Sequence, residues 1–229
     1  MAVEKKKRKK ISELQPERTH MPIQDPAERI RNFDEVTFGY SEEEALREAG
    51  RCLVCPKAKC TEACPVSIDI ATFIEQISAG DFRGAWLTIT DANLMPAVCG
   101  RVCPQEDQCE GVCVIGKKLE PVAIGRLERY LGDMAIREGW TARSEIEPNG
   151  KRVGIIGSGP AGIACAADMA KAGCEVIVFE ALHKPGGVLR ELGANKSLIF
   201  YCAFGERSAM AVQRTRKASG WPGQRQNRR

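Results

Sequence analysis

Two groups of four closely spaced cysteines constrain this chain more than any other feature. The first, RCLVCPKAKCTEACP at residues 51–65, has the spacing C-x2-C-x4-C-x3-C-P, and the second, CGRVCPQEDQCEGVC at residues 99–113, has spacings of three, five and three. Their members are Cys52, Cys55, Cys60, Cys64, Cys99, Cys103, Cys109 and Cys113. In a reducing compartment, clustered thiols hold metal more often than they form disulfides, so the sequence predicts a metalloprotein.

The charge distribution indicates a cytoplasmic protein. Residues 5–10 read KKKRKK with no apolar segment behind them, so a secretion signal is not expected. No run of about 18 apolar residues is present, so no membrane span is expected. Basic residues gather in 1–10 and 191–229, whereas residues 11–190 are net acidic. We therefore expect residues 1–20 to be a flexible basic tail, and we expect neither nucleic acid nor membrane as a partner.

Iron-sulfur chemistry fits the cysteine spacings better than zinc does. In bacterial ferredoxins, three closely spaced thiolates hold one cubane cluster, and a fourth thiolate, followed by a proline, reaches the other cluster. By this pattern, Cys52, Cys55 and Cys60 hold the first cluster. The second cluster takes Cys64, Cys103, Cys109 and Cys113. Zinc remains the alternative, although paired zinc sites usually show two C-x2-C knuckles per ion and only Cys52 and Cys55 have that spacing.

One ligand of the first cluster is left to assign, and two residues are candidates. Cys99 follows from counting, because eight thiols serve two cubanes with none left over. Glu128 follows from helix geometry, because it lies four residues after Ile124 and three before Leu131, in an apolar stripe. A buried carboxylate needs a metal or a cation, so one alternative is a salt bridge, for instance to Arg101, Arg126 or Arg129. The other alternative is that Glu128 lies at the edge of the apolar stripe.

The hydrophobic pattern predicts a helical first part and an α/β second part. Ser41 and Glu44 form a capping box, and Asp25, Asp69 and Asp81 mark further helix starts. We expect helices within residues 41–50, 70–79, 82–90 and 121–139. No strand-like alternation appears before residue 152, after which a strand, a glycine turn, a helix and a second strand follow. The predicted fold class is therefore α plus α/β.

A dinucleotide-binding fingerprint follows the strand VGII and opens a helix. Its residues are Gly157, Ser158, Gly159, Pro160, Ala161 and Gly162. The glycines allow a tight turn, a close approach of backbone to a pyrophosphate, and close packing of helix on strand. The next strand ends in Glu180, which would bond a ribose hydroxyl and disfavours a 2′-phosphate, so the adenosine belongs to FAD or NAD. Gly186 and Gly187 suit a backbone close to a ligand; a Rossmann unit without nucleotide is the alternative.

Taken together, these motifs resemble one family of oxidoreductases. The segments RCLVC, CTEACPVSIDI, PAVCGRVCPQEDQCEGVCV, PVAIGRLER and VGIIGSGPAGIACAADMAKAGCEVIVFEALHKPGGVLR are similar to the N-terminal portion of the NADPH-dependent glutamate synthase small subunit and its homotetrameric relatives. The same pattern occurs in the N-terminal half of dihydropyrimidine dehydrogenase and in the large subunit of NADH-dependent ferredoxin:NADP oxidoreductase. The likeness covers residues 20–190.

The resemblance implies domains and cofactors. Residues 21–143 would form an α-helical ferredoxin-like domain with two 4Fe-4S clusters, and residues 151–190 the start of an FAD-binding Rossmann-like domain. Glu128 matches the fourth ligand of the first cluster, with Cys99 nearby, and Arg190 would lie close to the isoalloxazine. NADPH gives a hydride to FAD, and electrons pass through the clusters to the glutamate synthase large subunit or another redox partner. The resemblance implies no catalytic acid or base, and it admits an oligomer.

The likeness stops at residue 190. Residues 191–229 are basic, poor in apolar residues outside SLIFYCAF, and typical of disorder. We therefore expect a truncated or frameshifted product with an aberrant tail and an incomplete FAD/NAD-binding βαβ unit, because a parallel sheet needs cover on both faces. The alternative function is a non-catalytic 4Fe-4S electron-transfer module. The ferredoxin:NADP oxidoreductase and sulfide dehydrogenase branches of the family also stay open.

Overall fold

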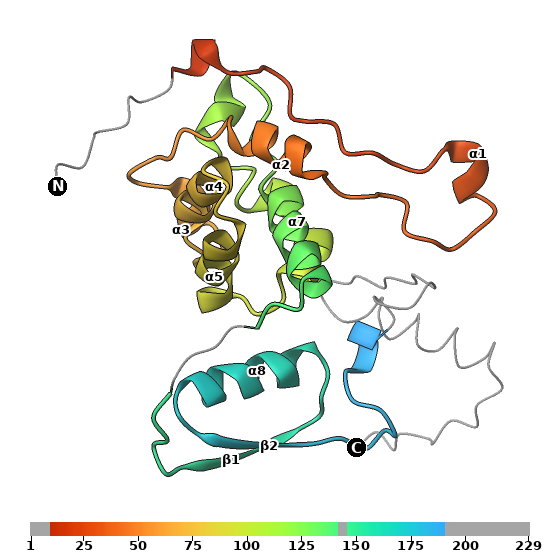
Figure 1. The fold of residues 1–229 in the computed structure, drawn as a ribbon, viewed down its shortest axis with the longest axis vertical. Coiled ribbons are helices and arrows are strands. Elements are labelled where there is room, and N and C mark those ends of the chain that lie inside the picture. The colour runs from red at the N-terminus through yellow and green to blue at the C-terminus, as the bar shows by residue number, and fades with distance from the viewer. Residues whose placement is uncertain (1–9, 142–145, 191–229) are drawn as a thin grey trace, which may run out of the picture.

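The computed structural model describes residues 10–141 and 146–190, and only the backbone of residue 190 (Figure 1). The helices and strands are α1 (Pro26–Arg29), α2 (Glu42–Ala49), α3 (Lys59–Glu62), α4 (Ile70–Ser78), α5 (Phe82–Ala92), α6 (Pro96–Val102), α7 (Ile124–Arg137), β1 (Arg152–Ile156), α8 (Pro160–Lys171) and β2 (Glu175–Phe179). Short 3-10 helices are η1 (Ile11–Glu13), η2 (Gln105–Asp107), η3 (Val114–Lys117) and η4 (Gly187–Arg190). The expected tail at 191–229 and the first nine residues of the basic tail lie outside the described residues.

Side-chain caps start the helices where the sequence predicts. The Ser41 backbone N–H donates to Glu44 at 2.7 Å and the Glu44 backbone N–H donates to Ser41 Oγ at 3.3 Å, which confirms the capping box of α2. Asp69 and Asp81 accept from the first turns of α4 and α5 at 3.2 and 2.9 Å. Each cap of this kind stabilises its helix by about 1 kcal/mol.

The helices α2, α4, α5 and α7 pack around one apolar core (Figure 1). The large side chains that are at most 1% exposed there include Phe73, Ile74, Ile77, Ile89, Leu127 and Leu131. The predicted apolar stripe of α7 is confirmed, because Ile124 and Met134 are buried as well. This bundle, residues 10–141, carries both cysteine groups.

Glycines allow α6 to lie directly against α7. A Cβ on Gly100 would come within 2.5 Å of the Arg129 backbone nitrogen, and a Cβ on Gly132 within 2.3 Å of the Ala97 nitrogen. No side chain fits at either crossing, so the two backbones lie in direct contact there. Because α6 carries Cys99 and ends before Cys103, this contact brings both thiols to α7.

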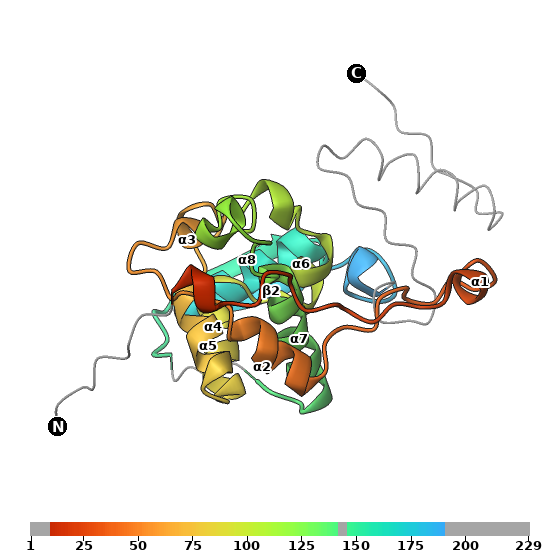
Figure 2. The same cartoon turned by 90° about the horizontal axis from the view of Figure 1, so that it is seen from above.

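An arm formed by residues 22–38 projects from the bundle and carries α1 (Figures 1 and 2). Its two sides meet in an antiparallel bridge between Ile23 and Thr37. Arg129 of α7 holds the base of the arm, donating to the Thr37 carbonyl at 2.8 Å and pairing with Glu35 at 3.2 Å. The bridge is too short to form a strand, in agreement with the sequence pattern.

Residues 146–190 form a small βαβ unit. The strands β1 and β2 run parallel, with Arg152 opposite Glu175 and Ile156 opposite Phe179, and α8 connects them. Gly157 makes the turn after β1 at φ +92°. Together with the bundle, this unit confirms the predicted combination of a helical part and an α/β part.

The βαβ unit contacts the bundle through the carboxyl end of α5. Lys171, in the last turn of α8, donates to the carbonyls of Thr90 and Asp91 at 2.7 and 2.8 Å. These carbonyls belong to the last turn of α5, which has no helical donors for them. Within the residues the structure describes, no helix combines the length and the apolar character that crossing a membrane requires.

Candidate iron-sulfur and nucleotide sites

Four thiols line one small cavity in the bundle. They are Cys52, Cys55, Cys60 and Cys113. Cys52 follows α2, Cys60 lies in α3 and Cys113 precedes η3, so loops and short helices bring the four together. Much of the remaining wall is aliphatic and includes Ile70, Ile74, Ile115, Val122 and Ile124. Four sulfur donors in an apolar wall are the donor set that a 4Fe-4S cluster takes.

Burial makes these thiols reluctant to ionise without a cation. Desolvation raises the pKa of Cys52 to about 12 and that of Cys60 to about 11, and the neighbouring thiols Cys113 and Cys55 add to both shifts. Metal ligation requires the thiolate form, and a bound metal reverses this balance by stabilising the negative charge. The cavity therefore suits a strongly bound cationic group.

The turn between Cys52 and Cys55 has an unusual backbone. Val54 lies at φ +48°, in the left-handed region that β-branched residues rarely adopt. This conformation aims the Val54 N–H at Cys52 Sγ, at 3.4 Å. Strained backbone of this kind gathers at functional sites, and here it supplies a hydrogen bond to a sulfur that lines the cavity.

A buried ion pair fixes the chain immediately before Cys52. Arg51 and Glu48 are 2% and 0% exposed and pair at 2.8 Å. Arg51 also donates to the carbonyls of Gln15, Pro16, Glu120 and Pro121. Glu48 accepts from the backbone of Thr19 and Ala123. The pair therefore ties two remote segments to the end of α2.

A second group of thiols gathers where α6 meets α7. Burial and the charges of Glu110, Glu128 and Cys64 raise the pKa of Cys109 to about 12. Cys103 shares a hydrogen bond with Cys99, which raises the pKa of Cys103 and lowers that of Cys99 to about 7. Cys103 also lies within electrostatic reach of Glu128 and Cys109. The members of this group are Cys64, Cys99, Cys103, Cys109 and Glu128.

Glu128 is a buried carboxylate at this second group. It is 7% exposed and accepts from Asn93 Nδ2 at 2.7 Å, and Asn93 Oδ1 lies 3.6 Å from Cys99 Sγ. Burial, followed by the charge of Cys99, raises the pKa of Glu128 to about 8, and the Asn93 hydrogen bond opposes the rise. A bound metal would stabilise the ionised form of this carboxylate, which burial disfavours.

The salt-bridge interpretation of Glu128 is wrong for the described residues. Arg101 pairs with Glu35 and Asp133 at 2.6 and 2.7 Å, and Arg129 shares both partners. Arg126 donates to the Thr19 carbonyl at 3.1 Å and also reaches the Tyr40 hydroxyl. The three arginines are therefore engaged elsewhere, and Glu128 faces thiols and an amide.

The grouping differs from the expected partition at two positions. Cys113 lines the cavity of Cys52, Cys55 and Cys60 instead of joining the second set. Glu128 lies beside Cys103 and Cys109 instead of completing the first set. The last cysteine of each sequence group lies with the other group in the structure. Cys64 lies near Cys109, and Cys113 lies with Cys52, Cys55 and Cys60.

Neither set is arranged around a single ion. Across residues 10–141 and 146–190, no three His, Cys, Asp or Glu side chains converge as the ligands of one metal ion do. A cubane distributes its ligands over four iron atoms, whereas zinc gathers four sulfurs at about 2.3 Å from one ion. The donor sets fit a cubane, and bound sulfide is the property that distinguishes a cubane from zinc.

The fingerprint residues lie together at the turn between β1 and α8. Gly159 caps α8, and Pro160 and Ala161 occupy its first turn. A Cβ on Gly162 would fall 1.9 Å from the Gly157 carbonyl oxygen, so this glycine permits the close packing of helix on turn. Glu180 follows β2 and accepts from the Ser158 N–H at 2.9 Å.

Glu180 is held ionised by its hydrogen bonds. The Ser158 hydroxyl, the Leu182 N–H and the Ser158 N–H all donate to it and lower its pKa to about 2. Gly186 and Gly187 have positive φ angles of 108° and 51° and lead the chain back to the turn. The side chain of Arg190 lies outside the described residues, so its expected place is untested.

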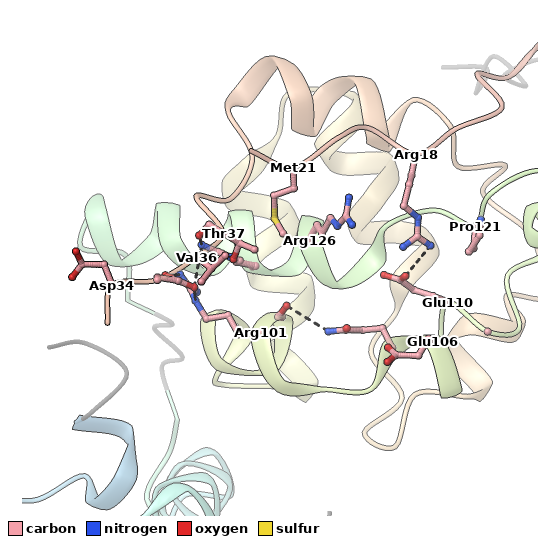
Figure 3. Close-up of a pocket in the computed structure, with 15 residues that line it drawn as sticks. Arg18, Met21, Asp34, Val36, Thr37, Arg101, Glu106, Glu110, Pro121 and Arg126 are labelled. Carbon is pink, nitrogen blue, oxygen red and sulfur yellow. Dashed lines mark hydrogen bonds and ion pairs between the residues drawn. The ribbon is translucent and has the colours of Figure 1, made fainter. Parts of the chain in front are cut away.

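A larger cavity, which no sequence signal marks, lies between the N-terminal segment and α6–α7 (Figure 3). It measures about 830 Å3, and its charged lining residues are Arg18, Arg101, Arg126, Arg129, Asp34, Glu35, Glu106 and Glu110. Arg18 pairs with Glu110 at 3.0 Å, as the dashed line in Figure 3 shows. Four arginines and four acidic residues line the cavity, so the lining favours neither an anionic nor a cationic ligand.

Comparison with known proteins matches both regions. Residues 29–140 match the family described as dihydropyrimidine dehydrogenase domain II, 4Fe-4S cluster, and residues 155–204 match the NAD(P)-binding Rossmann-like domain. The glutamate synthase [NADPH] small chain of Escherichia coli is 39% identical over 158 residues, which are 69% of this chain and 34% of that protein. The corresponding chain of Azospirillum brasilense is 38% identical over 172 residues, 74% of this chain and 36% of that protein.

A relative from the pyrimidine branch is equally similar. The NAD-dependent dihydropyrimidine dehydrogenase subunit PreT of Escherichia coli is 39% identical over 161 residues, 69% of this chain and 38% of that protein. The chain therefore spans well under half the length of these relatives.

The chain thus combines an iron-sulfur cluster domain with an NAD(P)-binding Rossmann-like domain. Over these two regions, it is a homologue of the glutamate synthase small chain and of its dihydropyrimidine dehydrogenase relatives. The resemblance predicted from the sequence is thereby confirmed.

Proposed function

We propose that this chain is the N-terminal portion of an oxidoreductase that carries electrons between NADPH, FAD and two 4Fe-4S clusters, in the branch of the glutamate synthase small chain. The observation that carries the proposal is the gathering of the cysteines into two sets from both halves of the bundle. Two glutamate synthase small chains among the homologues support the glutamate synthase branch. The equally similar PreT supports the pyrimidine branch as the alternative.

The two sets suggest specific ligands. For the first cluster we assign Cys52, Cys55, Cys60 and Cys113, because these four thiols share one cavity. For the second we assign Cys64, Cys103, Cys109 and Glu128. Glu128 takes precedence over Cys99 because a buried carboxylate without a cation is costly, whereas Cys99 keeps Asn93 and Cys103 as hydrogen-bonding neighbours.

The chain's own residues hold and shield these groups. When bound, the clusters and the flavin supply electron transfer, which side chains alone do not provide. Ile70, Ile74 and Val122 exclude water from the first thiol cavity, and the Arg51–Glu48 pair fixes the residue before Cys52. Asn93 orients the Glu128 carboxylate toward the second set. These contacts position the cofactors and tune them.

Metal and sulfide content after anaerobic purification tests the proposal. We expect about eight iron and about eight sulfide atoms per chain. Zinc bound without sulfide would refute the iron-sulfur assignment for both sets.

Paired substitutions test how the ligands are divided. Cys52→Ala combined with Cys113→Ala removes two ligands of one cluster, so about four irons per chain should remain. Cys52→Ala combined with Cys64→Ala affects both clusters and should leave almost none, which makes it the matched control. Loss of all iron from the first pair would restore the partition expected from the ferredoxin pattern.

Single substitutions distinguish Glu128 from Cys99. Glu128→Ala should weaken or abolish the electron paramagnetic resonance signal of the second cluster, whereas Cys99→Ala should retain that signal. The reverse result would assign Cys99 as the ligand. Iron counts on both variants separate loss of a cluster from a change in its spectrum.

Flavin content tests the nucleotide part of the proposal. Glu180 at the fingerprint turn supports FAD as the bound nucleotide, because a carboxylate there accepts from a ribose hydroxyl and repels a 2′-phosphate. Release of FAD on denaturation of the purified chain would support this assignment. The proposed electron acceptor is the glutamate synthase large subunit.

A second candidate function is a non-catalytic iron-sulfur electron-transfer module. The exposed strands favour it, because Ile156 is 93% and Phe179 58% exposed in the described unit, whereas a parallel sheet needs cover on both faces. Full iron content without flavin, in a chain that still transfers electrons to an artificial acceptor, would favour the module over the flavoprotein.

A further inference from the structure

Ser158 joins three parts of the nucleotide-binding unit through hydrogen bonds. Its hydroxyl donates to the Glu180 carboxylate and accepts from the Gly186 N–H at 2.9 Å. Its own N–H donates to the same Glu180 oxygen, Oε2, at 2.9 Å. Ser158 is 3% exposed although its neighbours on the turn are not buried. One hydroxyl therefore connects the fingerprint turn, the end of β2 and the loop of residues 186–190.

The acceptor sites of Glu180 are nearly filled. A carboxylate offers about four lone-pair sites. Ser158 occupies two of them on Oε2, and the Leu182 N–H occupies one on Oε1 at 2.9 Å. The Ala181 N–H also interacts with this carboxylate, and a ribose presents two neighbouring hydroxyls. A ribose hydroxyl that reaches Oε2 therefore competes with the Ser158 hydroxyl for that oxygen.

The other bond of Ser158 holds the loop in place. The loop lies close to the turn, because a Cβ on Gly187 would come within 3.1 Å of the Gly159 Cα. The Gly186 N–H is directed at the Ser158 hydroxyl, and Leu189 N–H closes the loop onto the Gly186 carbonyl at 3.0 Å. Among the described residues, no other side-chain bond reaches residues 186–190 from the turn.

We propose that Ser158 is a positioning residue that preorganises the 186–190 loop for the second half of a dinucleotide, at the expense of one acceptor site for the adenosine ribose. The inference rests on the nucleotide site proposed above. A ligand that ends after the adenosine diphosphate is affected only by the competition between its ribose and the Ser158 hydroxyl for Glu180. A ligand that continues along the loop also gains from the preorganised backbone, because less ordering accompanies its binding.

Binding of two probes to the full 229-residue chain tests this. Ser158→Ala should weaken FAD about fivefold, the effect of one hydrogen bond, while ADP binds equally or up to about fivefold tighter. The ratio of the two dissociation constants, measured by titration calorimetry, is the readout. Cys165→Ala is the matched control, because it removes an exposed thiol from the same unit and should leave the ratio unchanged.

Amide hydrogen exchange of the ligand-free chain gives a second measurement. Ser158→Ala should speed exchange at Gly186 about fivefold. Exchange at Gly173, whose N–H donates to the Ala170 carbonyl, should not change if the unit remains folded. If the wild-type chain binds both FAD and ADP and Ser158→Ala leaves the ratio of their dissociation constants unchanged, the role of Ser158 is overturned and the nucleotide site is not. A wild type that binds neither would overturn it together with the nucleotide site.

Discussion

The bundle and the βαβ unit differ in how completely they bury their apolar side chains. Of the buried apolar residues in the described chain, all but Ile155 belong to the bundle. In the βαβ unit, Ile156, Ile177 and Phe179 are 93%, 39% and 58% exposed. A parallel sheet needs cover on both faces, and one helix covers only one. The bundle therefore carries its own stability, whereas the βαβ unit depends on the surfaces that it contacts.

The largest expected effect comes from breaking the buried ion pair of the bundle. Glu48→Gln leaves the Arg51 charge buried without a counter-charge, so the free energy of unfolding should fall by about 3–5 kcal/mol. Urea denaturation followed by far-ultraviolet circular dichroism measures it. Glu43→Gln is the control, because its pair with Arg47 is exposed and its loss should cost under about 1 kcal/mol. Equal losses in the two variants would mean that the buried pair does not organise the bundle.

Matched truncations of apolar side chains probe the same contrast directly. Leu131 is fully buried in the bundle, so Leu131→Ala should destabilise it by about 2–5 kcal/mol. Ile177→Ala, on the partly exposed strand β2, should cost about 1 kcal/mol or less. Both values come from denaturation curves monitored by hydrogen exchange in each region. A cost at Ile177 as large as at Leu131 would show that the strand faces are covered.

The sequence predicts features that depend on neighbouring residues. The capping box of Ser41 and Glu44 and the caps at Asp69 and Asp81 involve residues three positions apart, so the sequence places them correctly. The fingerprint turn is local for the same reason. Each of these features needs only the geometry of one helix or one turn.

The grouping of the thiols depends on packing that no local pattern encodes. Glu128 lies beside the second group because glycines let α6, which carries Cys99, lie directly on α7. The turn before η3 places Cys113 at the first cavity. The ferredoxin pattern anticipates the transfer of Cys64 but not the reciprocal transfer of Cys113. Partners such as Arg101 and Glu35 are 66 residues apart, and the sequence carries no signal of their pairing.

A smaller effect is expected at the junction between the two regions. Lys171→Met removes the cation that bonds the last carbonyls of α5, which should loosen the βαβ unit by about 1–2 kcal/mol. Native-state hydrogen exchange should show faster exchange in α8 and the strands, with unchanged exchange in α7. Lys151→Met, at an exposed position before β1, is the control. If exchange in the unit is unaffected by Lys171→Met, the unit does not depend on the bundle.

The smallest effect is expected where residue 140 packs on α5. The Arg83 guanidinium lies 5.8 Å from the Trp86 ring centre and 5.5 Å from that of Trp140, and it donates to the Thr141 carbonyl at 3.4 Å. Arg83→Met keeps an apolar stem but removes the charge, so the loss should be about 0.5–1 kcal/mol. Because Arg83 is exposed, water already solvates its charge, so the loss of the cation–ring interaction has a small effect on stability.

Tryptophan fluorescence in a Trp221→Phe background reports this site, since Trp86 and Trp140 are then the remaining tryptophans. Arg137→Met is the control, because Arg137 pairs with Glu138 at the surface, whereas Arg83 is the cation over the rings. We expect a shifted emission for Arg83→Met alone and a smaller change in the exchange of α8 than Lys171→Met produces. An effect on α8 larger than that of Lys171→Met would mean that the ring contact, and not the lysine, couples the unit to the bundle.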